Sequence, residues 1–250
     1  MFGLSAGDAR SAELLYLATV DKWSGSWVCM KVLAEIYRQA GLQMQVLPMP
    51  ILRAHLMAVS GRVDGELCRI YGYEAPELVR VEPGYYRISI LAYSMRARNV
   101  EVRKPADLLK YSLGTIRGVH YSDGLTKDHP AVTRAINSEQ MFRMLQAGRV
   151  DLVLEASGTA QTSLDKLNMS AREVVASPEL VGFDLFNFLH KRHQGLVPRI
   201  SEAIRRVKAS GELERLTARY EAAVAGVDME AFSTSPQVLD RLEAASAPSP

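Results

Sequence analysis

A four-residue segment occurs twice in the chain, and this repetition constrains the fold more than any other feature of the sequence. Gly61-Arg62-Val63-Asp64 recurs as Gly148-Arg149-Val150-Asp151. Each copy follows a stretch with helical spacing of apolar residues, over 52–59 and 141–147, and precedes a short apolar run. Because glycine readily adopts the left-handed conformation that ends a helix, each copy predicts a helix terminus followed directly by a strand. The aspartates are expected to shape the turn rather than to carry chemistry.

A second similarity extends the repeat to two halves of the chain. Leu17-Ala18-Thr19-Val20 resembles Leu113-Gly114-Thr115-Ile116, and each opens a run typical of a strand. The first half then contains a helical pattern over 27–40 and an alternating strand pattern over 42–46, and the second half has a strand pattern over 131–136. We therefore expect each half to fold as strand, helix, strand, helix, strand. Such halves favour a mostly parallel sheet with right-handed crossovers, and two of them leave a cleft between two α/β lobes.

The remainder of the chain continues with helices and strands and ends in a tail. The patterns predict a helix over 157–167, strands over 174–175 and 183–189, and a long helical region over 198–224 that is interrupted at Ser210-Gly211. Asn137 or Ser138 is a suitable N-cap for the helix before Gly148. The segment 227–250 passes into Ala, Ser and Pro, and we expect it to be a poorly ordered C-terminal tail.

Composition excludes several functional classes. Hydrophobic residues make up 48% and charged residues 23% of the 250 residues, which is enough for a packed core without disulfides or metals. The formal net charge of +2 indicates no nucleic-acid partner and no membrane-surface binding. No apolar run reaches the roughly 20 residues that span a bilayer, and no intact signal peptide is visible at the N-terminus.

The cysteines and histidines indicate neither a metal site nor a redox motif. Cys29 and Cys68 match no zinc or C-x-x-C spacing, so we expect both to pack in the core, with a single disulfide as the alternative. His190 and His193 are the closest pair of histidines, and their basic surroundings favour exposure over metal binding. Because no nucleophile-elbow, zinc-protease, Walker or dinucleotide-binding motif occurs, we expect no cofactor, no metal and no catalytic residue.

In order along the chain, these segments resemble the type 2 extracellular solute-binding proteins of ABC importers, in particular family 3, the polar amino-acid group. The resemblance covers about Leu14 to Val224. It rests on the aromatic loop at Trp23 and on the segments LMAVSGRVDGEL, VEPGYYRISILAYS, LGTIRGVHY, MLQAGRVDLVLE and ISEAIRRVKASGELERLTARY. Each motif is weak alone, and their order makes the set fairly specific.

The resemblance implies a periplasmic binding protein-like type II fold, in which two α/β lobes are joined by two crossings with a ligand cleft between them. The crossings would lie near 92–96 and 181–185. Lobe 1 would then be discontinuous, with residues 1–93 plus 185–226, and lobe 2 would comprise 94–184. Closure of the lobes about these crossings would trap the ligand.

Ligands of parallel α/β sheets bind beyond the carboxyl ends of the strands, which directs attention to the strand exits. In lobe 1, Trp23 and Ser24 match the aromatic ligand wall of the family, although Trp23 could also be an ordinary surface or core residue. Arg69 lies where the family approaches its ligand and could grip a carboxylate with two hydrogen bonds, or form a structural ion pair. The arginine of the family's T-x-x-R pattern is absent, since Tyr73-Glu74-Ala75-Pro76 stands there.

In lobe 2, Arg117, Gly118 and Val119 lie at the turn where the family binds the acidic end of its ligand. Ser138, next to Asn137, is a candidate polar contact. Glu155 ends the second repeat strand, where family members place an acidic residue for a ligand ammonium group; the alternative is a solvated strand end. With Arg69 and Arg117 facing Glu155, the cleft would favour a zwitterion or a small anion.

The resemblance thus implies a monomeric receptor that binds a small polar solute, an amino acid or related small carboxylate, and releases it unchanged to an ABC transporter permease. Its location would be periplasmic or extracellular. Two alternatives stay open. One is the ligand-sensing module of a signalling system. The other is an enzyme of the same fold such as a cyclohexadienyl or arogenate dehydratase, in which Glu155 would act as a general acid.

Overall fold

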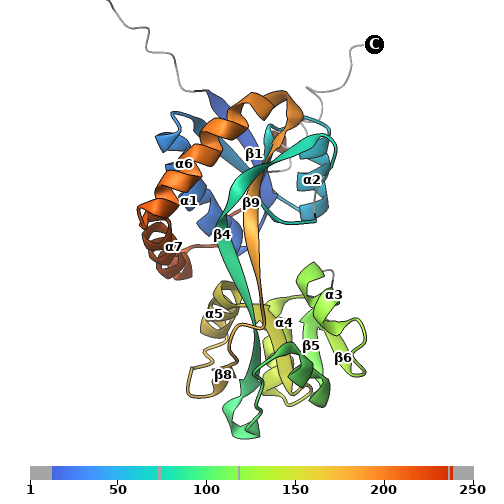
Figure 1. Ribbon diagram of the computed structural model, residues 1–250. Coiled ribbons are helices and arrows are strands. Elements are labelled where there is room, and N and C mark those ends of the chain that lie inside the picture. Colours follow the sequence, from blue (N-terminus) through green and yellow to red (C-terminus); the bar gives the residue numbers. More distant parts are fainter. Residues whose placement is uncertain (1–12, 73–74, 118, 236, 239–250) are drawn as a thin grey trace, which may run out of the picture.

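The computed structural model of the chain has two lobes joined by a pair of long strands (Figure 1). It describes residues 13–235 except 73–74 and 118, together with 237–238. The connecting strands are β4 (Leu78–Met95) and β9 (Val181–His190). The two α/β lobes and the two crossings between them agree with the sequence prediction. The lobe boundaries 1–93 plus 185–226 and 94–184 stay a prediction.

Each half of the chain has the predicted order of strand, helix, strand, helix, strand. The first half consists of β1 (Leu14–Val20), α1 (Ser24–Gln39), β2 (Gln43–Met49), α2 (Ile51–Val59) and β3 (Gly65–Ile70). The second consists of β5 (Leu113–Ile116), α3 (His120–Thr126), β6 (Val132–Ala135), α4 (Ser138–Gln146) and β7 (Leu152–Ala156). In each half the first strand pairs in parallel with the other two.

The remaining elements complete both lobes. Lobe 2 adds α5 (Ser157–Lys166) and the short strand β8 (Val174–Ala176), and lobe 1 adds α6 (Val197–Ala209) and α7 (Glu212–Ala223). Short 3-10 helices cover Arg96–Arg98, Pro105–Lys110, Lys191–Leu196 and Val224–Gly226. The predicted interruption of the C-terminal helical region lies between α6 and α7, at Gly211, whose φ is +69°. Asn137 is the N-cap of α4 and accepts a hydrogen bond from the Gln140 amide.

One sheet runs through both lobes in the order β2-β1-β3-β9-β4-β7-β5-β6, with β8 on β4. Within each half the strands pair in parallel, as expected, but the sheet as a whole also contains antiparallel pairs. Strands β4 and β9 run in opposite directions between the lobes, so they pair antiparallel with each other and with the strands beside them. Parallel pairing is confined to the repeated halves, where helices connect the strands.

The repeated segment has the predicted role in both lobes. Gly61 and Gly148 have φ values of +70° and +67°, so each ends its helix in the left-handed conformation. Asp64 accepts a hydrogen bond of 2.8 Å from the Tyr16 amide, and Asp151 accepts one of 3.0 Å from the Ser112 amide. Each aspartate thus links the start of the third strand of its half, β3 or β7, to the first strand of that half by a hydrogen bond.

Two further expectations concern the cysteines of lobe 1 and the segment after residue 226. Cys29 and Cys68 are buried free thiols, as expected of core residues. The Lys22 amide donates to the Phe232 carbonyl at 3.2 Å, and the Thr234 amide donates to the Pro48 carbonyl at 2.8 Å. The first residues of the expected tail therefore contact lobe 1, and residues 239–250 lie outside the described part.

The histidine pair differs in one respect from the expectation of exposure. His190 and His193 are both half-buried, and Nε2 of His193 lies 2.6 Å from the Asp64 carboxylate. In the described part of the chain, no helix combines the length and the apolar character that a membrane span requires.

The hydrogen bonds of Asp151 predict a measurable pH dependence of stability. Bonds from the Ser112 hydroxyl and then from its amide hold the pKa of Asp151 below its ordinary value. A carboxylate whose pKa is lowered by folding stabilises the fold above its unfolded pKa of about 3.9, and this contribution is lost as the pH falls through the folded value. We expect Asp151→Ala to reduce the free energy of unfolding by about 1–2 kcal/mol at pH 7.

Urea unfolding of the wild type and of Asp151→Ala at several pH values measures this effect. The difference between them should narrow as the pH falls from about 5 to 3. The exposed Asp128 supplies the control variant Asp128→Ala. An equal loss in both variants, or a difference that does not change with pH, would contradict the role of Asp151.

Candidate functional site

The strand exits of both lobes surround a cavity of about 300 Å³, called the interlobe cleft here. Lobe 1 contributes Val20, Trp23, Ile51, Cys68, Arg69 and Ile70. Lobe 2 contributes Ile116, Val119, Glu155, Ala156 and Thr159, and the crossing strands contribute Ile88 and Leu185. Carboxyl ends of parallel strands in both lobes therefore meet at one cavity, which is where ligands of open α/β sheets bind. Its volume lies within the range of small-molecule sites.

Arg69 owes its orientation to an irregularity in β3. In a regular strand, residues three apart point to opposite faces. The register between β3 and β9 shifts between Glu66 and Arg69, where three steps along β3 match two along β9. This bulge turns the Arg69 side chain toward Glu66, and its Nε forms an ion pair with Glu66 Oε2.

The ion pair is part of a buried network. Arg69 is 4% exposed and Glu66 is 1% exposed. The second carboxylate oxygen of Glu66, Oε1, lies 2.7 Å from Nδ1 of His55 on α2. The ion pair with Glu66 therefore holds a residue that lines the cleft. The planar guanidinium of an arginine matches the geometry of a planar carboxylate.

Glu155 brings the opposite charge from lobe 2. It occupies the end of β7, is 2% exposed and lines the cleft. Its Oε1 accepts a hydrogen bond of 2.9 Å from the amide of Ala156, the N-cap of α5. The solvated strand end considered from the sequence is wrong, because the Glu155 side chain is buried.

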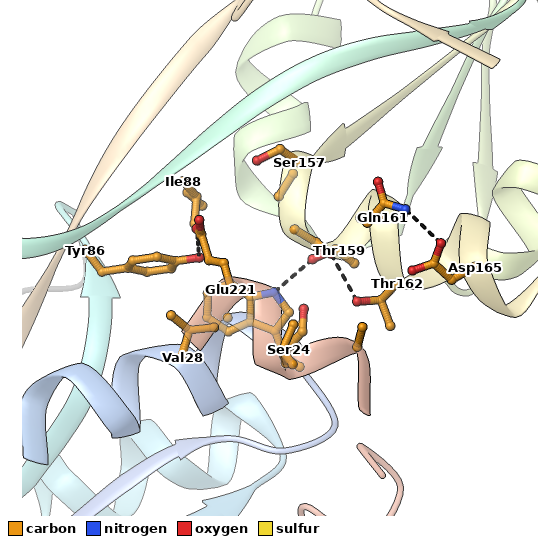
Figure 2. Close-up of a pocket in the computed structure, with 16 residues that line it drawn as sticks. Ser24, Val28, Tyr86, Ile88, Ser157, Thr159, Gln161, Thr162, Asp165 and Glu221 are labelled. Atoms are coloured by element: carbon orange, nitrogen blue, oxygen red, sulfur yellow. Dashed lines mark hydrogen bonds between the residues drawn. The ribbon is translucent and has the colours of Figure 1, made fainter. Parts of the chain in front are cut away.

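Trp23 connects the two lobes. It is the N-cap residue of α1, and its indole Nε1 donates a hydrogen bond of 3.2 Å to the Thr159 hydroxyl on α5. Figure 2 shows this bond meeting Thr159. The indole lies over Gly25, where an added Cβ would come within 2.3 Å of the ring atom Cζ2. Gly25 is therefore the residue that lets the indole pack against its own helix and reach lobe 2.

A second cavity, of about 240 Å³, shares Trp23 as a lining residue and is called the α5–α7 cavity here (Figure 2). It shares Trp23, Ile88, Ala156 and Thr159 with the interlobe cleft. Its lining is more polar: the Tyr86 hydroxyl donates to Glu221 Oε1 at 3.0 Å, and the Gln161 amide donates to Asp165 Oδ1 at 2.7 Å. Burial raises the pKa of Tyr86, so its hydroxyl stays protonated and remains a donor.

The residues predicted from the sequence divide among several places. Trp23, Arg69, Val119 and Glu155 line the interlobe cleft. Ser24 is buried and lines the α5–α7 cavity. Arg117 is exposed, and Ser138 is the first residue of α4; within the described part of the chain neither is among the residues that line the two cavities. Gly118 lies outside the described residues. The role of these residues as ligand contacts stays a prediction.

Comparison with known proteins gives no family assignment by sequence. No protein-family model matches the chain. A protein of Shewanella oneidensis described as uncharacterized is 22% identical over 184 residues, which are 71% of this chain and 69% of that protein.

Solved structures share the architecture of most of the chain. The ligand-binding core of GluR0 in complex with L-glutamate aligns with a TM-score of 0.67 at 13% identity, over 84% of this chain and 99% of its own. The chain has a type II periplasmic-binding-protein fold. A histidine kinase sensor domain with similarity to periplasmic binding proteins gives 0.66 at 12% identity, over 84% and 96%. The amino acid ABC transporter substrate-binding protein AbpA of Streptococcus pneumoniae, bound to L-arginine, gives 0.63 at 15%, over 86% and 97%.

The periplasmic-binding-protein fold predicted from the sequence is therefore confirmed. Several cleft residues were not singled out from the sequence, among them Ile51, Ile70, Ile116 and Thr159. Ile51 follows β2 and Ile70 ends β3, so their positions at strand exits were a usable signal, but the candidates predicted there in lobe 1 were aromatic, polar or charged residues. The contact between Glu66 and Arg69 could not be predicted from the sequence, because regular strand alternation places the two side chains on opposite faces of the sheet.

The buried network predicts a strong dependence of stability on Glu66. Removing one partner of a buried ion pair leaves the other charge uncompensated and typically costs about 3–5 kcal/mol. We expect Glu66→Gln to lower the free energy of unfolding by an amount near the lower end of this range, as measured by urea denaturation. The double variant Glu66→Leu with Arg69→Met should recover most of the loss, since it removes both charges. A Glu66→Gln variant within about 0.5 kcal/mol of the wild type would contradict this account.

The packing of the indole on Gly25 predicts the behaviour of Trp23. In Gly25→Ala the new methyl group would displace the indole and break its bond to Thr159. In a Trp27→Phe background, which leaves one tryptophan, the fluorescence of Trp23 should shift to longer wavelength as the indole gains contact with water. Gly195→Ala is the matched control, because an added Cβ there meets nothing within 4 Å. Equal spectra for the two alanine variants would show that Gly25 does not position the indole.

Proposed function

We propose that the chain binds a small carboxylate-bearing molecule, an amino acid or a close relative, in the interlobe cleft and releases it unchanged. The observation that carries the proposal is a cleft between two lobes into which one buried cation and one buried anion converge from opposite sides, Arg69 and Glu155. A zwitterion is complementary to this pair, since its carboxylate suits the guanidinium and its ammonium group suits the glutamate. Amino acids bound to AbpA and to the GluR0 core support the same ligand class.

The biological role that we propose is that of a receptor for an ABC importer, located in the periplasm or outside the cell, with a permease as its partner. The similarity to a substrate-binding protein of an amino acid ABC transporter supports it. A sensor role is the second candidate, because a histidine kinase sensor domain aligns equally well. Deleting the gene and measuring uptake of the labelled ligand separates them: an importer receptor is required for uptake, whereas a sensor alters a signalling output and leaves uptake intact.

A thermal-shift screen tests the proposed binding. A ligand at 100 times its dissociation constant stabilises the native state by about 2.7 kcal/mol, which for a chain of this size raises the melting temperature by roughly 5–10 °C. Amino acids and small carboxylates form the panel, and mass spectrometry of the recovered ligand checks that it is unchanged. Recovery of a dehydrated or decarboxylated product would instead support an enzyme.

Two conservative variants examine the site itself. Arg69→Lys keeps the positive charge next to Glu66 but loses the bidentate hydrogen bonding to a carboxylate. Glu155→Gln keeps the shape of the side chain and loses its charge. We expect either change to remove most of the ligand-induced shift while the melting temperature without ligand changes little by comparison. The exposed Arg143 gives the control variant Arg143→Lys. Unchanged shifts in both Arg69→Lys and Glu155→Gln would refute the assignment of the cleft.

A further inference from the structure

The walls of the interlobe cleft are apolar, and this feature bears on which ligand it can hold. Branched aliphatic side chains line it from lobe 1 at Val20, Ile51 and Ile70 and from lobe 2 at Ile116 and Val119. Ile88 and Leu185 on the crossing strands add to this surface. Side chains branched at Cβ are restricted in χ1, so a wall built from valine and isoleucine has a defined shape before any ligand arrives.

Among the described residues that line the cleft, charge is present at two positions. Arg69 and Glu155 are the charged residues among the described residues that line the cleft. The hydroxyl of Thr159 accepts the bond from the Trp23 indole. The polar groups of the cleft therefore suit the head of an amino acid or carboxylate, and most of the other described lining side chains are aliphatic and offer a polar ligand side chain no hydrogen bond.

Desolvation decides between a polar and an apolar ligand body. A buried polar group without a hydrogen-bond partner weakens binding by roughly ten-fold or more, whereas an apolar group gains affinity when it leaves water. Ile51 illustrates the second effect, because it lines the cleft and is still 42% exposed. A ligand body that covers Ile51 removes apolar surface of both partners from water.

We propose that the ligand of this cleft is amphipathic: a carboxylate, with or without an adjacent ammonium group, attached to a branched aliphatic or aromatic body. The inference rests on the proposed function, because it specifies the ligand class of the same site. It departs from the polar solute that the sequence resemblance implies. The head group is held near Arg69 and Glu155, and the body packs against the valines and isoleucines of both lobes.

The test compares ligands that share a shape and differ in polarity. Leucine and asparagine have side chains of similar branching, apolar in one and an amide in the other, and 4-methylpentanoate is leucine without its ammonium group. The chain is freed of bound ligand by unfolding and refolding and is titrated with each by calorimetry, with glutamate and glutamine as further polar arms. We expect leucine or 4-methylpentanoate to bind at least ten-fold more tightly than asparagine, with a negative change in heat capacity.

Isosteric variants test whether the apolar walls cause the preference for leucine over asparagine. Val119→Thr and Val20→Thr each replace a methyl group by a hydroxyl of nearly the same size, on opposite sides of the cleft. Either should weaken leucine about five-fold or more and leave asparagine unaffected or improved, which narrows the preference. The half-buried Val175 on β8, which is not among the described residues lining the cleft, gives the control Val175→Thr. Having two test variants keeps the experiment decisive if one of them fails to fold.

The outcomes separate this inference from the function it rests on. Tighter binding of asparagine, glutamate or glutamine than of leucine and 4-methylpentanoate would overturn the amphipathic ligand and leave the proposed binding function standing. Preference for leucine that is unchanged in both Val119→Thr and Val20→Thr would also overturn it, because the walls would then not be its source. If no member of either series binds, the proposed function itself fails and the inference with it.

Discussion

The antiparallel pairing of β4 with β9 is the interaction on which the rest of the structure depends. The two strands pair from Leu78 and His190 in lobe 1 to Ile90 and Val181 at the entrance of lobe 2. On the outer sides, β9 pairs with β3 and β4 pairs with β7, so each lobe attaches its own strands to one member of the pair. The backbone hydrogen bonds of this ladder hold the lobes in one sheet. Any change in their relative position must bend β4 and β9 together, which confines the motion to a hinge.

The repeat explains why that hinge has a binding site beside it. Parallel strands within each half all end at one edge, and the Gly61 and Gly148 turns return the chain to the opposite edge for the next strand. The carboxyl edge of each half borders the interlobe cleft. The cleft takes its walls from the carboxyl ends of β1 and β3 in one lobe and of β5 and β7 in the other. The duplicated glycine and aspartate thus have a structural role, and their functional consequence is the convergence of strand exits.

Most of the fold follows from patterns that a sequence displays directly. The helical spacing before each Gly-Arg-Val-Asp segment and the alternation in short apolar runs predict the βαβαβ halves, since these periods reflect which face of each element is buried. Strand β4 was expected only as a crossing near 92–96, because its 18 residues pass through two environments and follow no single alternation. Its antiparallel direction likewise depends on the path of the chain between lobes and has no local signal.

The site was less predictable than the fold because it depends on contacts between distant residues. Arg69 and Glu155 are strand-exit residues that the parallel topology brings to the cleft, which the sequence indicates. The orientation of Arg69 toward Glu66 requires a bulge that appears only when β3 is aligned with β9. The approach of Trp23 to Thr159 joins positions 136 residues apart and depends on the final placement of α1 against α5.

Trp23 finally constrains how the two cavities can change. The indole is a common wall of the interlobe cleft and the α5–α7 cavity, and its hydrogen bond to Thr159 joins the lobes at that wall. Separation of α1 from α5 must break this bond, and it alters the wall that the two cavities share. Since Gly25 supplies the space in which the indole rests, a displacement of this one ring changes the lining of both cavities. Any movement of the lobes about β4 and β9 that shifts Trp23 therefore changes both cavities at once, because the two share this residue.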